Sequence, residues 1–286
     1  MSVTDGMAHA TLGTDTGGLC RIPAALCGIV GFKSTAGRIS TEGVVPLSYS
    51  LDSVGPLANS VSCCAVVDAV IAGGRAKDAE PFPVEGLRLG APRFCVLDDH
   101  VARSFEHALR RLSEAGTETA LDELAEIPEI NKGGGIVDME AYAWHRPLVE
   151  KYADRYDPWI LARFDLPKQQ SAADYIDLLR ARRDLIERVH RTSRRFDALV
   201  MPTVAITAPT LAELEGPEAS TWANMLVLRN TMVGNFLDRT AISLPCHGAG
   251  EAPVGLLLIG EHGDDRRLLS LAAGVEGVVS PNQGNR

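Results

Sequence analysis

The sequence predicts an α/β protein, because short apolar strand segments alternate along the chain with amphipathic helices. Residues 87–92 alternate between apolar and other side chains and then break at a proline, which is typical of a strand. Residues 99–115 follow with apolar side chains at helical spacing, and the same strand-then-helix order recurs downstream. The size and composition agree with this class: 286 residues, 45% hydrophobic and 23% charged, are sufficient for a sizeable core.

The N-terminal third contains turns and one clear helix. Its first 40 residues are rich in glycine and small side chains, which permit tight turns and close backbone approach. Residues 60–72 predict a helix that a serine caps and that Gly73-Gly74 ends. Further on, aromatic and charged residues over 131–167 indicate a helical region with a long irregular connection.

The C-terminal part predicts a regular succession of strands and helices. Residues 172–196 form a long helix by their spacing, and its many arginines form either a solvated face or an anion site. Largely apolar runs are typical of buried central strands. The remaining expected elements are strands over 197–202, 240–245 and 254–260, a helix over 221–236, and a helix over 264–276 capped by Asp264 or Asp265, with a frayed tail after Gly277.

Charge and cysteine usage exclude several classes of partner. The net charge of −9 and the pI of about 5.3 argue against nucleic acid or an anionic membrane as the main partner. No apolar run is long enough for a membrane-spanning helix, and the N-terminus lacks the pattern of a secretory signal. The six cysteines show neither metal-ligand spacing nor a disulfide pattern, so we expect a cytoplasmic protein without a metal site.

The run Gly13-Thr-Asp-Thr-Gly-Gly18 is the feature most informative about function. Amide hydrolysis through an acyl-enzyme requires a nucleophile, a proton acceptor, and donors for the oxygen that becomes negative. Glycines leave backbone N–H groups uncovered, and such a run can form a concave nest of donors. A pair of glycines by itself is more often a simple turn, so the run alone leaves both interpretations open.

The longer sequence around this run resembles the amidase signature family. Residues 12–60 match that family nearly position by position, and shorter matches follow at Phe196-Asp-Ala-Leu-Val-Met-Pro-Thr, Asn230-Thr and Asn235-Phe. The resemblance implies a mixed β-sheet core flanked by helices on both faces. It also implies one partial domain over 1–286, made of a signature core (1–75), a divergent substrate-shaping region (76–195), C-terminal core elements (196–277) and a tail (278–286).

The same resemblance implies hydrolysis of a carboxylic amide C–N bond by a Ser–cis-Ser–Lys triad, with no cofactor. The oxyanion donors would be the backbone N–H groups of Thr16, Gly17, Gly18 and Leu19. Asp15 and Arg21 match a buried pair that orders the loop, which is a structural role. The position of the catalytic serine is occupied by Leu19, which has no nucleophilic atom.

Two departures from the family predict that this copy holds the loop without the chemistry, as a non-catalytic amidase-like fragment or a ligand-binding module. One is Leu19; the other is that the bridging serine and the lysine of the family lie upstream of the residues matched here, so we expect an N-terminally truncated chain. Two alternatives stay open: an amide hydrolase acting on a small molecule in a longer form, and a deliberate change of serine to leucine. Sheet edges left uncovered by truncation predict poor solubility or a homodimer.

Four side chains are candidates to replace the missing groups. Cys20 adjoins Leu19, but neighbouring residues on an extended segment project to opposite sides, which favours a packed thiol. Lys33 is a tempting base, although the resemblance makes it a structural residue of the segment. His247 and His262 are single histidines without an obvious partner in the sequence.

Overall fold

The computed structural model describes residues 1–122 and 135–280, and within them the fold is built on a mixed sheet of eight strands. The order across the sheet is β1-β3-β2-β7-β8-β6-β4-β5. β4 pairs in parallel with β5 and β6, whereas the other neighbours are antiparallel. The strands are β1 (Ala10–Asp15), β2 (Val30–Lys33), β3 (Ser53–Ala58), β4 (Arg88–Pro92), β5 (Glu118–Asp122), β6 (Ala198–Pro202), β7 (Ala241–Pro245) and β8 (Gly255–Ile259).

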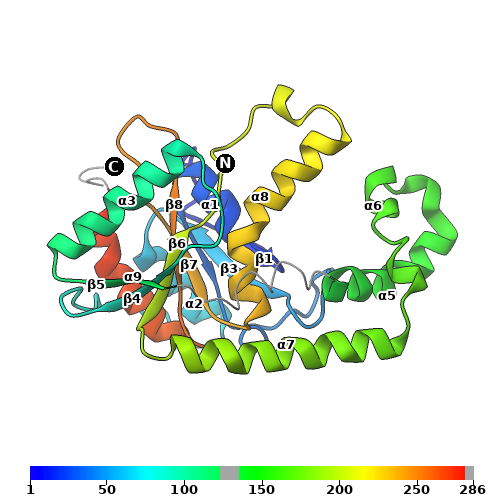
Figure 1. Ribbon diagram of the computed structural model, residues 1–286, viewed down its shortest axis with the longest axis horizontal. Coiled ribbons are helices and arrows are strands. Elements are labelled where there is room, and N and C mark those ends of the chain that lie inside the picture. Colours follow the sequence, from blue (N-terminus) through cyan, green and yellow to red (C-terminus); the bar gives the residue numbers. More distant parts are fainter. Residues whose placement is uncertain (123–134, 281–286) are drawn as a thin grey trace.

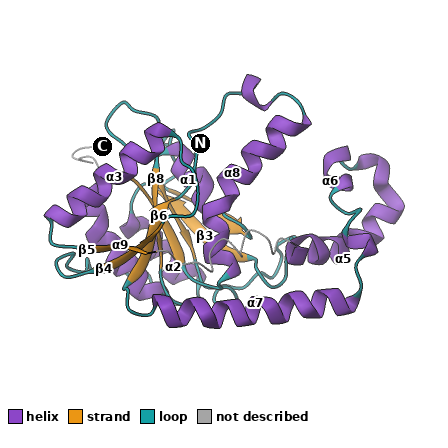
Figure 2. Ribbon diagram, in the orientation of Figure 1, coloured by secondary structure: helices purple, strands orange, loops and turns teal. Residues whose placement is uncertain are grey.

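Helices cover both faces of this sheet (Figures 1 and 2). The α/β class and the mixed sheet flanked by helices are therefore confirmed. The helices are α1 (Arg21–Cys27), α2 (Val61–Ile71), α3 (Asp99–Glu114), α5 (Gly135–Tyr152), α6 (Pro158–Ala162), α7 (Ala172–Ser193), α8 (Pro217–Phe236) and α9 (Asp265–Val279), with 3₁₀ turns η1 (Ala153–Arg155), η2 (Pro167–Gln169) and η3 (Ala212–Leu214).

The central strands β6, β7 and β8 are buried along their whole length, so alternate residues enter two separate cores. Val200 and Leu258 face one core with side chains of α2, α3 and α9. Leu199 and Leu257 face the other core with side chains of α5, α7 and α8. Apolar residues on both sides explain why these strands appear in the sequence as nearly continuous apolar runs.

The expected elements after residue 60 agree with the structure to within a few residues. Ser60 caps α2 by accepting the N–H of Cys63 at 3.2 Å. α8 begins at Pro217, four positions before the expected start, because proline suits the first helical turn. Two predictions fall partly outside the described residues. These are the helical region over 131–167, for residues 131–134, and the frayed tail, for residues 281–286.

The predicted cap of α9 is wrong. Asp264 occupies the N-cap position but makes no side-chain cap hydrogen bond. Asp265 binds a different part of the chain, because its carboxylate accepts the N–H and the hydroxyl of Thr35 at 2.8 and 2.7 Å. A long-range contact has thus replaced the local cap.

Three further features concern the whole of the described chain. All six cysteines are free thiols. In the described ranges, no helix is both long and apolar enough to cross a bilayer. The same ranges contain no cluster of three His, Cys, Asp or Glu side chains placed to hold a metal ion.

Glu276 on α9 predicts a pH-dependent stability. Its carboxylate lies beside the start of α2 and accepts the N–H of Val61 at 3.1 Å, while burial raises its pKa to about 7. The folded state therefore favours the protonated form of Glu276. The stabilisation that this preference gives the folded state is complete below pH 4.5 and is lost as the pH rises through 7. We expect the free energy of unfolding to fall by about 1–2 kcal/mol over this interval, with solvent screening included.

The measurement is urea unfolding at pH 5 and pH 8. Glu276→Gln should remove this part of the pH dependence, whereas Glu114→Gln, at an exposed position on α3, should leave it unchanged. Equal pH dependence in the parent protein and in Glu276→Gln would contradict the assignment.

Candidate functional site

The glycine-rich run forms the connection between β1 and α1, and its conformation depends on Gly18. This residue has φ +145°, a backbone conformation that favours glycine. A Cβ atom at Gly18 would lie 2.3 Å from Thr231 Oγ1, so no larger residue fits without a shift of α8. The carbonyl of Gly18 accepts the N–H groups of Arg21 and Ile22 at 2.9 and 2.7 Å, which starts α1 immediately after the loop.

The loop leaves a row of backbone donors unused. Among the described residues, no atom accepts a hydrogen bond from the N–H of Gly17, Gly18 or Leu19. Thr16 precedes them, and its hydroxyl donates to Asp52. Successive free N–H groups in a loop before a helix form a positive concavity, which suits the oxygen of a polarised carbonyl.

A buried ion pair joins the two ends of this loop. Arg21 donates from Nη2 to Asp15 Oδ1 at 2.8 Å and from Nε to Asp15 Oδ2 at 3.0 Å, and neither side chain is exposed to solvent. Burial by itself would raise the pKa of Asp15, but the Arg21 charge and its hydrogen bonds hold it below the ordinary value. The bidentate geometry ties the end of β1 to the first residue of α1.

The same pair is connected to α8. Arg21 Nη1 donates to the carbonyl of Thr231 at 2.8 Å, and Arg21 Nη2 donates to Asn235 Oδ1 at 2.5 Å. Asn235 in turn donates to Asp15 Oδ1 at 2.8 Å, and the hydroxyl of Thr231 donates to the carbonyl of Gly17 at 2.6 Å. Thr231 and Asn235 lie in the short matches to the amidase signature family, but the sequence alone assigns no role to either residue.

Leu19 and Cys20 project to opposite sides of the loop. The Leu19 side chain is 52% exposed and lines a cavity, whereas Cys20 is completely buried. The Cys20 thiol contacts the carbonyl of Gly55 at 3.6 Å, and burial next to Asp15 raises its pKa well above the ordinary value. A buried thiol with a raised pKa is a poor nucleophile, in agreement with the expected packed side chain.

The other candidate replacements lie away from this cavity. Lys33 is buried and donates from Nζ to the carbonyls of Ser34 and Arg239 at 2.7 and 2.9 Å, and burial lowers its pKa to about 8. His247 accepts the N–H of Val254 at 3.3 Å, and His262 pairs with Asp238 at 3.2 Å. None of the three residues lines the cavity at Leu19.

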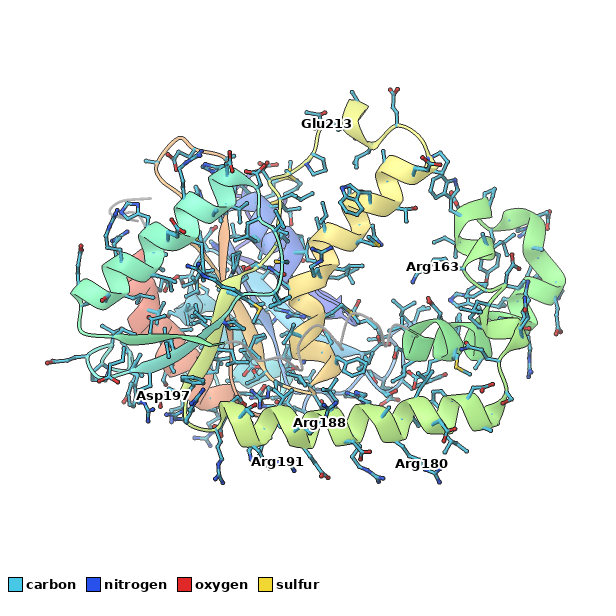
Figure 3. The ribbon with its side chains drawn as sticks, viewed as in Figure 1. Arg163, Arg180, Arg188, Arg191, Asp197 and Glu213 are labelled. Atoms are coloured by element: carbon cyan, nitrogen blue, oxygen red, sulfur yellow. The ribbon has the colours of Figure 1, made fainter. Side chains whose placement is uncertain are left out.

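The cavity at Leu19 has a volume of about 870 Å³, which is the size of a small-molecule site. Most of its wall is apolar and comes from α1 and α8, including Ile22, Leu228 and Met232. The charged residues of its wall are Asp138, Arg163 and Arg229. Figure 3 shows Arg163 projecting from the end of α6 towards α8, and its guanidinium donates to Asp138 at 2.7 Å.

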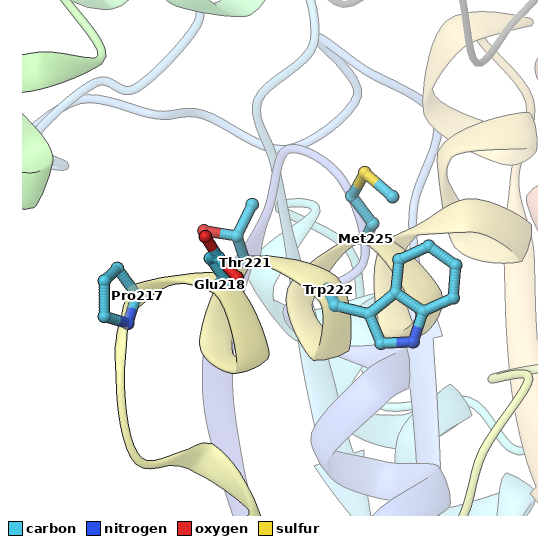
Figure 4. A pocket seen from close by; sticks show the side chains of 5 residues that line it. All are labelled: Pro217, Glu218, Thr221, Trp222 and Met225. Carbon is cyan, nitrogen blue, oxygen red and sulfur yellow. The ribbon is translucent and has the colours of Figure 1, made fainter.

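A second and shallower pocket, of about 350 Å³, lies on the outer turns of α8 (Figure 4). Trp222 and Met225 form its apolar side. Met225 also lines the larger cavity, so apolar side chains continue along α8 from the protein surface towards Leu19.

Comparison with known proteins gives consistent results. The Amidase family model matches residues 2–269. A 2-amino-5-chloromuconic acid deaminase of Comamonas testosteroni is 33% identical over 292 residues, which cover 98% of this chain and 62% of the relative. An amidase of Pseudomonas putida is 30% identical over 300 residues, which cover 96% of this chain and 64% of the amidase.

A solved structure has the same fold. A glutamyl-tRNA(Gln) amidotransferase subunit from Thermotoga maritima superposes with a TM-score of 0.80 and 25% sequence identity, over 98% of this chain and 64% of that protein. The chain thus spans somewhat less than two thirds of the length of these relatives. Sequence and structure agree, and the chain belongs to the Amidase family.

Proposed function

We propose that this chain carries the amide-binding part of an amidase site, and that Leu19 leaves this site without its nucleophile. The observation that carries the proposal is the row of N–H groups at Gly17, Gly18 and Leu19, which has no acceptor among the described residues and adjoins a cavity of about 870 Å³. Together with the N–H of Thr16, these groups would donate to the carbonyl oxygen of a small carboxamide. Asp15 and Arg21 would order the loop.

The chemistry expected of the family explains what Leu19 removes. A serine at this position would attack the carbonyl carbon through Oγ and pass its proton to a base. The C–N bond would then break, the nitrogen would leave as ammonia or an amine after taking up a proton, and water would hydrolyse the acyl ester to a carboxylic acid. Leu19 has no atom that could form the acyl bond, so this sequence of steps cannot begin there.

The second candidate function is C–N bond hydrolysis by a longer protein that includes these residues. The family match and the relatives named amidase and deaminase favour it. A partner protein is a further proposal, since one relative carries the name of an amidotransferase subunit.

The experiment that tests the proposal compares Leu19 with Leu19→Ser in the longest open reading frame that contains these residues. Ammonia release from benzamide and propionamide, and labelling by a fluorophosphonate, are measured for both. We expect Leu19→Ser to be labelled and to exceed the parent by about 10³-fold or more, since loss of a serine nucleophile has effects of this order.

Leu19→Ala is the matched control, because it removes the same side chain without adding a hydroxyl. It should remain inactive and unlabelled. Turnover of either amide by the protein with Leu19 would overturn the proposal that the site lacks chemistry. Failure of benzamide to bind any of the three proteins would overturn the proposal that the site holds an amide.

A further inference from the structure

Glu140 on α5 is a buried carboxylate with an unusual number of hydrogen-bond donors. It is only 7% exposed, and its Oε2 accepts the hydroxyl of Ser48 at 2.5 Å and the N–H of Ser50 at 3.0 Å. Its Oε1 accepts the hydroxyls of Ser50 and Tyr175. Burial acts to raise the pKa of Glu140, but these hydrogen bonds together bring it below the ordinary value, so the group stays ionised.

The segment that donates to Glu140 is attached at its other end to the glycine-rich loop. Asp52 Oδ2 accepts the N–H groups of Leu47 and Ser48 at 2.9 and 3.0 Å. Asp52 Oδ1 accepts the hydroxyl of Thr16, the first residue of that loop. A continuous series of hydrogen bonds therefore runs from α5 through residues 47–52 to Thr16.

One end of this series, Thr16, lines the cavity at Leu19, and the other end, Glu140, lies on the same helix as two residues that line it. Val137 and Asp138 line it from the turn of α5 that precedes Glu140, and Thr16 lines it from the loop. α5 and α6 extend away from the sheet (Figure 1). Arg163, directly after α6, also lines the cavity and is joined to α5 by its ion pair with Asp138.

We propose that Glu140 is a positioning residue for this cavity. Through residues 47–52 and Asp52, it sets the distance between the wall formed by α5 and the N–H groups that follow Thr16. A fully hydrogen-bonded buried carboxylate suits this task, because each of its bonds has a defined length and direction, whereas apolar contacts permit sliding. The inference rests on the proposed function in one respect, namely that a carboxamide is the ligand.

The experiment is a double-mutant cycle on the full chain, with benzamide as the probe. Glu140→Gln keeps the size of the side chain but places an amide group where Ser48, Ser50 and Tyr175 donate. Thr16→Val removes the hydroxyl at the other end of the series and keeps the backbone N–H. Glu150→Gln, at an exposed position of the same helix, is the matched control.

We expect Glu140→Gln and Thr16→Val each to raise the Kd of benzamide about fivefold or more, and Glu150→Gln to change it less than twofold. Because the two residues belong to one series of hydrogen bonds, the double variant should bind benzamide only slightly more weakly than either single variant. The proposal would be overturned if the two increases in Kd multiplied in the double variant, or if Glu140→Gln bound benzamide as tightly as the parent protein.

Two further measurements keep the result interpretable. Where Glu140→Gln does not fold, Ser50→Ala replaces it, since that change removes one hydroxyl donor and leaves the carboxylate with its other partners. Where benzamide binds neither parent nor variants, the proposed ligand is wrong, and the cycle is read from urea unfolding midpoints instead. Non-additive midpoint shifts support the positioning role, and additive shifts overturn it.

Discussion

Replacing Arg21 by alanine should lower the free energy of unfolding by about 3–5 kcal/mol. The change leaves Asp15 fully buried without the guanidinium that neutralises it, and removal of one partner of a buried ion pair has effects of this size. It also removes the donors to Thr231 and Asn235, so the contact between α1 and α8 is weakened as well. Urea unfolding followed by circular dichroism measures the loss.

Arg88→Ala is the control for this prediction. Arg88 is 54% exposed and lies 3.9 Å from Glu118, which is itself 75% exposed. An exposed pair of this kind contributes less than about 1 kcal/mol. The role assigned to Arg21 would be wrong if Arg21→Ala and Arg88→Ala destabilised the protein equally.

The second large effect is expected at Gly274 on α9. A Cβ atom there would lie 2.0 Å from the carbonyl oxygen of Phe82, which is a backbone atom and cannot rotate away. Gly274→Ala should therefore lower the free energy of unfolding by about 1–3 kcal/mol, because α9 must move away from the segment that carries Phe82.

Gly277 allows a matched comparison on the same helix. Apart from the neighbouring backbone of α9 itself, no atom of the described residues lies within 4 Å of a Cβ placed there, so Gly277→Ala adds helix propensity without a clash. We expect stabilisation of up to about 1 kcal/mol. Thermal and urea unfolding of both variants measure the difference, and destabilisation by both would show that the contact with Phe82 does not decide the outcome.

Four strands are not predicted from the sequence, namely β5 and the three strands of the signature segment. β1, β2 and β3 contain Gly13, Gly31 and Gly55, which interrupt the alternation of apolar and polar residues that identifies a strand. Their role is visible only in the packed structure: a Cβ at Gly55 would lie 1.9 Å from the carbonyl of Phe32, and one at Gly31 would lie 2.3 Å from that of Cys20. These glycines permit the strands and α1 to approach closely.

The candidate site was accessible from the sequence only in part. The loop and Leu19 were identified from the resemblance of a continuous segment. Thr231, Asn235 and Glu140 were not assigned, since each acts on residues far away in the chain; Arg21 and Asn235, for example, are 214 positions apart. No local pattern marks a side chain as the partner of such a distant residue.

The amino-acid sequence alone was sufficient for the α/β class, for most elements beyond residue 60 and for the family resemblance, because periodicity, caps and a long contiguous motif are local properties of the chain. The order of the eight strands, the two-sided core and the cavity beside Leu19 emerged only from the tertiary structure. The physical reason is that burial and hydrogen-bond pairing depend on which distant segments meet. Leu19 illustrates both levels. Its identity can be read from the sequence, but its position on a cavity wall, next to N–H groups that have no acceptor among the described residues, results from packing.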